Sequence, residues 1–132
     1  MTAALRAHAA GLLCAEAAVE LLIGHGVWLH RTGFVDRFVV VQADRALVGQ
    51  SVLAWVDWHA AADAVATGQV VCSAGEGRIL LIAASIAKGV PLDLGDAVTG
   101  LDAVNSVLVA RAVLAAGGHH GVAEDLVGVA WR

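Results

Sequence analysis

Residues 73–91, SAGEGRILLIAASIAKGVP, contain both a start signal and a stop signal for one long helix. Ser73 and Glu76 form the S-x-x-E pattern of a reciprocal capping box, in which each side chain accepts a hydrogen bond from the other residue's backbone amide. The glycine and the proline at the end of the stretch are typical of residues that follow a helix C-terminus. Most side chains between these signals are apolar, so the pattern predicts a buried central helix over 74–88.

The remaining segments also have mostly helical patterns. Short polar residues that can cap a helix precede several apolar segments, and glycines follow most of them. These signals predict helices from Thr2 to about Ile23, Trp58 to Ala66, Ala103 to Ala116 and Ala123 to Trp131. Residues 38–41 fit either a helix or a strand, and residues 44–50 fit a loop. Residues 52–56 are short, apolar and rich in strand-forming types, which indicates a strand.

We therefore expect a mainly α fold. It is a single compact domain over 1–132, with about five or six helices around the central helix 74–88 and a small β-ribbon near 52–56. Residues 119–132 are expected to form a C-terminal segment that is either mobile or packed on a partner. The alternative is an α+β fold with strands at 38–41, 52–56 and 69–72.

The hydropathy of the chain raises the question of a membrane. Of its 132 residues, 59% are hydrophobic, and the mean hydropathy is +0.77. However, the longest stretches free of Asp, Glu, Lys and Arg are about 12 residues, whereas a membrane-spanning helix needs about 20 apolar residues. We expect no membrane association and a cytoplasmic location. The bias toward alanine, valine and glycine is typical of a GC-rich bacterial gene.

The charge balance bears on the class of partner. The net charge is −4, and eight Lys and Arg residues are spread thinly along the chain. Proteins that bind nucleic acids usually gather basic residues into a patch that faces the phosphates. Direct nucleic-acid binding is therefore not expected.

Ser73 resembles a catalytic nucleophile only superficially. A nucleophile elbow has the pattern G-x-S-x-G, but Val71 occupies the position of the first glycine, where a side chain would crowd the tight turn. Ser73 is thus expected to cap the helix. Cys72 lies beside the helix N-terminus, where the helix dipole lowers a thiol pKa, but the preceding valines indicate burial. No catalytic residue is assigned.

The histidines and cysteines show no spacing typical of a metal site. His25 and His30 lie on either side of an expected helix break, His119 and His120 are adjacent, and the two cysteines are far apart. We expect no metal and no cofactor.

The tryptophans form the most informative group. Indoles dominate burial where they occur and are enriched where one protein anchors into another. They either fill a core that alanine and valine leave loose, or they form an interaction surface. The candidate interaction residues are Trp28, Trp55, Trp58 and Trp131.

These observations favour a small non-catalytic protein-interaction module, a homodimer or an accessory subunit. The apolar fraction exceeds what one small core requires, and large apolar surface on a folded chain is usually covered by a partner. The alternative is a small enzyme or ligand-binding protein with a site around Asp57, Cys72 and His25, or His30. A nucleic-acid-associated accessory protein is the third possibility.

Overall fold

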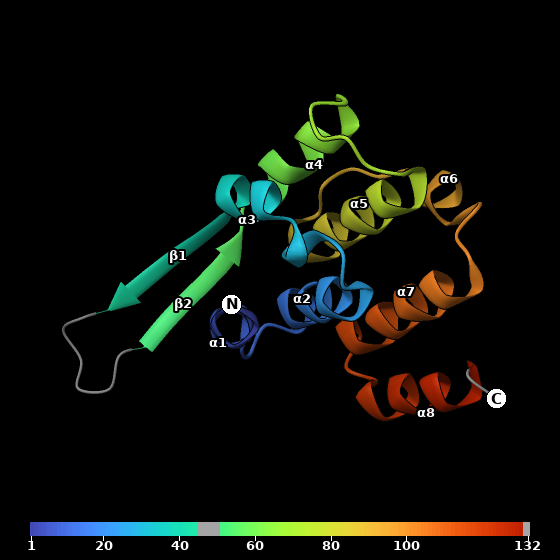
Figure 1. Cartoon of the computed structure of the whole chain (residues 1–132). Helices are drawn as coiled ribbons and strands as arrows, with labels where there is room; N and C mark the ends of the chain where they lie inside the picture. The colour runs from blue at the N-terminus through green and yellow to red at the C-terminus, as the bar shows by residue number, and fades with distance from the viewer. Residues whose placement is uncertain (45–50, 131–132) are drawn as a thin grey trace.

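The computed structural model describes residues 1–44 and 51–130, and the side chains of residues 1–43 and 52–126. Helices dominate, and one two-stranded antiparallel sheet accompanies them (Figure 1), so the predicted mainly α fold is confirmed. The elements follow in the order α1 (Thr2–Ala9), α2 (Leu13–His25), η1 (Trp28–His30), α3 (Thr32–Phe38), β1 (Val39–Asp44), β2 (Ser51–Val56), α4 (Trp58–Ala66), α5 (Ala74–Lys88), α6 (Leu94–Val98), α7 (Ala103–Ala116) and α8 (His120–Ala130).

The central helix forms where the sequence predicts it. Ser73 caps α5, because its hydroxyl accepts a hydrogen bond from the Glu76 amide at 3.1 Å. The Glu76 carboxylate accepts from the Ser73 amide at 2.8 Å and completes the capping box. Gly89 ends the helix in a left-handed conformation with φ of 65°. Ile79 and Leu80 are fully buried, and α5 packs between α2 and α4.

The predicted helix from Thr2 to Ile23 is wrong as one element. The chain breaks at Gly11, whose φ of +87° is a left-handed conformation that favours glycine. The break separates α1 from α2 and lets α1 pack against β2. The second helix continues through Gly24 to His25, and Gly26 ends it with φ of +73°.

Residues 38–41 combine both predicted conformations. Phe38 ends α3, and Val39 begins β1. The strand pairs antiparallel with β2, from Val39 opposite Val56 to Asp44 opposite Ser51. The predicted ribbon near 52–56 is thereby confirmed, whereas residues 45–50 of the expected loop lie outside the described residues.

The third strand of the α+β alternative is absent from residues 69–72. This segment is a turn and an extended connection between α4 and α5. The amides of Gln69 and Val70 both donate to the carbonyl of Ala64, which fastens the connection to the end of α4.

The described part of the C-terminal segment packs on its own chain. Helix α8 begins at His120, earlier than predicted, and lies against α7 with Ala123 buried. Trp131 lies outside the described residues.

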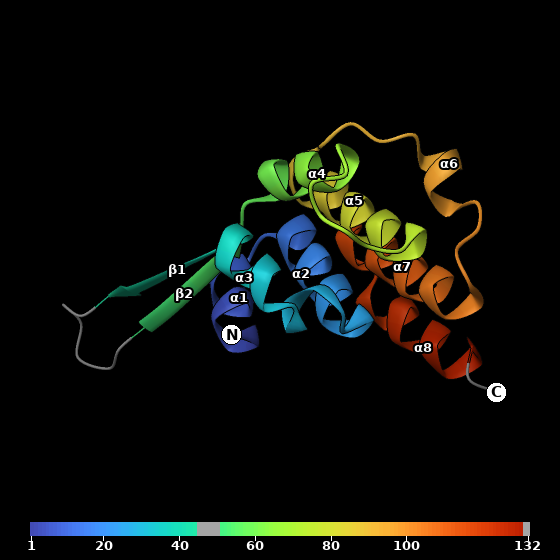
Figure 2. The same ribbon diagram turned by 45° about the horizontal axis from the view of Figure 1, so that its top comes forward.

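The β1–β2 hairpin projects from one end of the helical body, and α8 lies at the other end (Figures 1 and 2). The buried apolar residues of the body, from Ala4 to Ala112, form one cluster. No helix in the described part of the chain is both long enough and apolar enough to cross a membrane.

Candidate interaction surface

Trp28 is a core residue. Its side chain has 0% exposure, and its indole nitrogen donates to the backbone oxygen of Glu76 at 3.0 Å. The Arg31 guanidinium lies 5.0 Å from the centre of the indole ring and covers its outer face. A side chain with no exposed surface cannot contact a partner of the folded chain, so the structure does not place Trp28 on an interaction surface.

Trp55 and Trp58 line one cavity. It has a volume of about 350 Å³ and lies between α1, β2, α4 and the end of α5, with Leu5, His8, Asp57 and Lys88 also in its wall. Trp55 is half-buried, and the His8 ring stacks on it at a centroid distance of 4.9 Å. Trp58 is buried. These two indoles, unlike Trp28, therefore border space that another molecule can enter.

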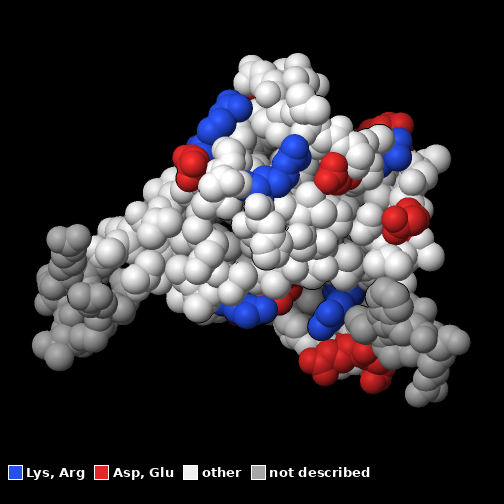
Figure 3. All heavy atoms as spheres, in the orientation of Figure 1, with Lys and Arg blue, Asp and Glu red and all other residues white. Residues whose placement is uncertain are grey.

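The hairpin carries an exposed apolar surface that the tryptophan analysis missed. Val40 is 43% exposed, Val41 is 54% exposed and Val52 is 43% exposed. Neither 39–43 nor 52–56 contains a charged residue. In Figure 3 the described part of the hairpin is accordingly white on the face shown. We call Val40, Val41 and Val52 the hairpin surface.

The strand β1 forms an edge of the sheet. Among the described residues, it pairs with no strand other than β2. On the other side of the sheet, β2 contacts α1. The run of uncharged valines at 39–41 was the sequence signal for this surface, but the sequence does not show that the hairpin extends beyond the body.

The structure does not bring Asp57, Cys72 and His25 into one site. Asp57 caps α4, accepting from the Ala60 amide at 3.2 Å, and lines the same cavity as Lys88 at the end of α5. Cys72 precedes the opposite end of α5. This helix has 15 residues, and at 1.5 Å per residue it spans roughly 22 Å. Asp57 is therefore remote from Cys72.

His25 and Cys72 do share a neighbour, the Glu76 carboxylate. Burial lowers the pKa of His25, and nearby Glu76 and Asp102 oppose that shift. Burial also raises the pKa of the Cys72 thiol, with Glu76 adding to the effect. Burial thus disfavours both the imidazolium and the thiolate, which opposes the thiolate–imidazolium pair of an activated cysteine. His30 ends η1 with an exposed side chain.

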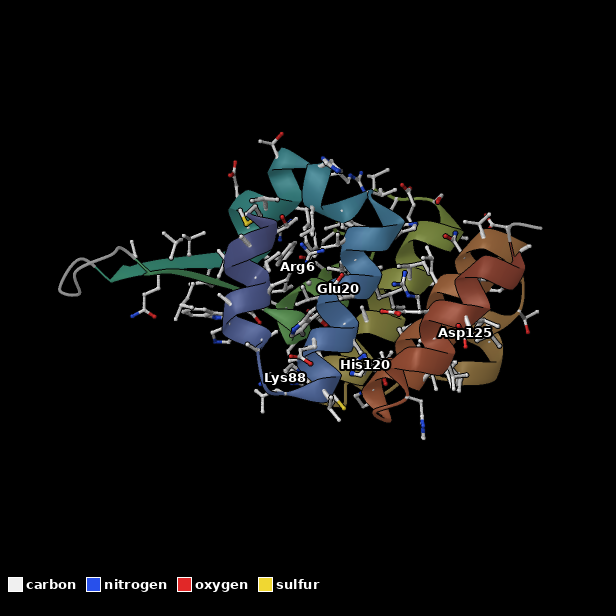
Figure 4. The ribbon with its side chains drawn as sticks, turned by 90° about the horizontal axis from the view of Figure 1, so that it is seen from below. Arg6, Glu20, Lys88, His120 and Asp125 are labelled. Atoms are coloured by element: carbon white, nitrogen blue, oxygen red, sulfur yellow. The ribbon has the colours of Figure 1, made fainter. Side chains whose placement is uncertain are left out.

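A groove with four polar residues in its wall lies between α1, α2 and α8. Arg6 and Glu20 meet across α1 and α2 (Figure 4), with Arg6 Nε 2.6 Å from Glu20 Oε1 and Arg6 Nη2 3.2 Å from Glu20 Oε2. Glu16 accepts from the Gly11 amide at 3.1 Å, and His120 also lines the groove. Because both carboxylates already have partners that hold the helices, these residues have a structural role. No group of three or more His, Cys, Asp or Glu side chains in the described part of the chain is placed to hold a metal ion.

Comparison with known proteins does not add a function: no family model, no curated protein and no solved structure matches the chain.

Proposed function

We propose that this chain is a non-catalytic protein-interaction module that self-associates through the hairpin surface. The observation that carries the proposal is the projecting hairpin, whose exposed valines lie in segments 39–43 and 52–56, which contain no charged residue. Exposed apolar strands promote aggregation unless something covers them. Contact with another chain would cover the hairpin surface.

The chemistry elsewhere in the molecule favours binding over catalysis. The Ser73 hydroxyl and the Glu76 carboxylate are occupied by the capping box. Burial raises the pKa of the Cys72 thiol, which disfavours the reactive thiolate. The candidate nucleophile therefore has a helix-capping role instead of a neighbouring base.

Self-association is tested by sedimentation velocity over about 1–100 μM, a range that covers typical specific dimers. We expect a concentration-dependent dimer. A wild-type chain that stays monomeric over the whole range contradicts the proposal. Val41→Lys places a charge on the hairpin surface and is expected to shift the dimer toward monomer. The matched control is Val113→Lys, because Val113 is 55% exposed but lies on α7, away from the hairpin.

The cavity beside Trp55 supports a second candidate function, the binding of a small apolar or aromatic anion. Its volume of about 350 Å³ lies within the range of roughly 300–1,000 Å³ typical of small-molecule sites. Two indoles and Leu5 supply an apolar wall, Lys88 supplies a cation, and the Asp57 carboxylate in the same wall is engaged by the Ala60 amide.

The dye 1-anilinonaphthalene-8-sulfonate, an aromatic anion, is a suitable probe for this cavity. We expect its fluorescence to rise on binding and the rise to be lost in Trp55→Ala. If Val41→Lys abolishes the signal while Trp55→Ala retains it, the dye binds the hairpin surface and the cavity assignment is wrong.

A further inference from the structure

The backbone of β1 has a defined outward face. The Phe38 carbonyl accepts a hydrogen bond from the Asp57 amide at 2.7 Å, so Phe38 directs its backbone groups toward β2. Backbone direction alternates along an antiparallel strand. With the register of Val39 opposite Val56, the residues whose backbone groups point away from β2 are Val39, Val41 and Ala43.

This outward edge lacks a partner within the described part of the chain. The Val39 amide bonds the Val35 carbonyl at the end of α3. No described backbone group bonds the Val39 carbonyl, or the amide and carbonyl of Val41 and Ala43. Natural edge strands are usually protected by charged residues, proline or bulges. Residues 39–43, VVVQA, contain neither a charge nor a proline.

We infer that β1 pairs antiparallel with β1 of a second copy, about a two-fold axis at Val41. This inference rests on the proposed self-association and specifies its geometry. The Val41 amide donates to the carbonyl of the partner's Val41, and the reverse bond forms by symmetry. The Ala43 amide donates to the carbonyl of the partner's Val39. The two hairpins then form one continuous sheet across the dimer.

We infer a second copy of the chain as the partner of this edge, because the free donors and acceptors of β1 match those of an antiparallel β1. Val39 offers an acceptor but not a donor, since its amide is already bonded within its own chain. The proposed register places that acceptor opposite the Ala43 amide, which needs one. A two-fold interface is isologous, so the same edge of each chain takes part. The paired segment 39–43 carries no charge and therefore has no like-charge repulsion to overcome.

The register centred on Val41 is preferred to its neighbour centred on Gln42. The latter sets Val40 opposite the acidic Asp44, an apolar residue against a charged one. Centring on Val41 sets the most exposed valine of the hairpin surface against its own copy and Val40 against Gln42. Exposed apolar surface is then removed from water at the axis.

The first test replaces Val41 by proline. Proline lacks an amide proton and is tolerated on edge strands where that proton would face solvent. Val41→Pro therefore removes an outward donor but leaves the β1–β2 ladder intact. We expect the dimer to weaken by about tenfold or more, because both symmetric Val41 hydrogen bonds are lost.

Val71→Pro is the control. Val71 is 83% exposed, lies on the connection between α4 and α5 outside the hairpin surface, and its amide donates to no described backbone group. It should leave the dimer unchanged. Circular dichroism reports whether both variants remain folded.

A second test does not depend on the proline variant. In a chain carrying Cys14→Ser and Cys72→Ser, Val41→Cys brings two thiols together at the axis. Directly opposed residues in a hydrogen-bonded antiparallel pair have Cα atoms about 5.5 Å apart, within disulfide range. We expect a covalent dimer on mild oxidation. Val52→Cys should give little covalent dimer, because the two copies of Val52 lie three strand spacings apart, roughly 14 Å across the sheet, and are offset by about four residues along it.

The outcomes separate this inference from the proposed function. A monomeric wild-type chain overturns both. A wild-type dimer that tolerates Val41→Pro and does not cross-link through Val41→Cys overturns edge pairing and leaves self-association standing. A dimer that is lost in Val41→Lys but retained in Val41→Pro packs face to face, which also overturns edge pairing.

Discussion

The indole nitrogen of Trp28 donates a hydrogen bond to the backbone oxygen of Glu76, 3.0 Å away, and thereby ties η1 to the first turn of α5. The Phe34 ring packs against the same indole at a centroid distance of 5.1 Å. Because Trp28 is fully buried, this hydrogen bond satisfies a polar group that water cannot reach. The contact anchors the N-terminal half of the chain to the central helix.

Replacing Trp28 should therefore destabilise the fold more than replacing Trp55. We expect Trp28→Ala to lower the free energy of unfolding by about 3–5 kcal/mol, the range for large aromatic truncations in a core. Trp28→Phe should cost about 1–3 kcal/mol, because it removes the buried hydrogen bond between η1 and α5 and leaves the Glu76 carbonyl with only its partner inside the helix. Urea unfolding measures both values. Trp55→Phe is the control, and an equal loss there would contradict the anchoring role of Trp28.

The capping box should contribute measurably to stability. Ser73→Ala removes the acceptor for the Glu76 amide and is expected to cost about 1 kcal/mol, a typical value for a lost N-cap. Ser85→Ala is a matched control within α5, because Ser85 lies inside the helix and caps nothing. Equal unfolding midpoints for Ser73→Ala and the wild type would contradict the capping role.

The decrease in the free energy of unfolding at low pH should depend on Glu76. Hydrogen bonds from the Ser73 amide and then its hydroxyl lower the pKa of Glu76 below its ordinary value of 4.5. The Glu76 carboxylate therefore binds a proton more readily in the unfolded chain than in the folded one. Its contribution to the free energy of unfolding is fully present above pH 4.5 and is lost as the pH falls through its lower pKa in the folded chain. Glu76→Gln should flatten the loss of stability below that pH in urea melts, whereas Glu124→Gln on α8 should not. An unchanged decrease at low pH in Glu76→Gln would count against this explanation.

Local signals predicted the elements whose ends are fixed by neighbouring residues. Ser73 caps α5 and Asp57 caps α4, because each side chain accepts a hydrogen bond from the amide three residues on, and the sequence shows both capping patterns directly. The sequence did not predict the break at Gly11, because a glycine can adopt either a helical or a left-handed conformation. Gly24, in contrast, stays helical. A Cβ at this position would lie 3.2 Å from the Leu108 side chain, so the close packing of α2 on α7 explains why a glycine stands there.

The candidate surface was less predictable than the fold. The sequence marks four tryptophans as equivalent, but the burial of Trp28 depends on a carbonyl 48 positions away. Likewise, the valines of β1 have the composition of a core strand. Their exposure follows from the hairpin's projection beyond the body, a tertiary property that periodicity does not encode.

His25 should make the protein less stable in mild acid. Burial lowers its pKa, so protons bind the unfolded chain more readily than the folded one. The contribution of neutral His25 to the free energy of unfolding is therefore fully present above its ordinary pKa of 6.5. It is lost as the pH falls through the lower pKa that His25 has in the folded chain. The urea midpoint should decline between pH 7 and pH 5, and His25→Gln should reduce that slope. His59→Gln, at an exposed position, is the control; a wild-type slope in His25→Gln would show that another group is responsible.

The two cysteines should differ in reactivity. Cys14 is exposed near the start of α2, whereas Cys72 is half-buried and burial raises its thiol pKa, with Glu76 adding to the rise and Arg31 opposing it. Alkylation requires the thiolate, so Cys14 should react first with iodoacetamide at pH 8.

Single variants separate the two rates. Cys14→Ser should leave a slowly reacting chain, and Cys72→Ser should retain the fast phase, as followed by mass spectrometry of the intact protein. Faster labelling in Cys14→Ser than in Cys72→Ser would mean that the helix N-terminus outweighs burial at Cys72. The thiol would then be activated, and a catalytic or redox role for residue 72 would regain support.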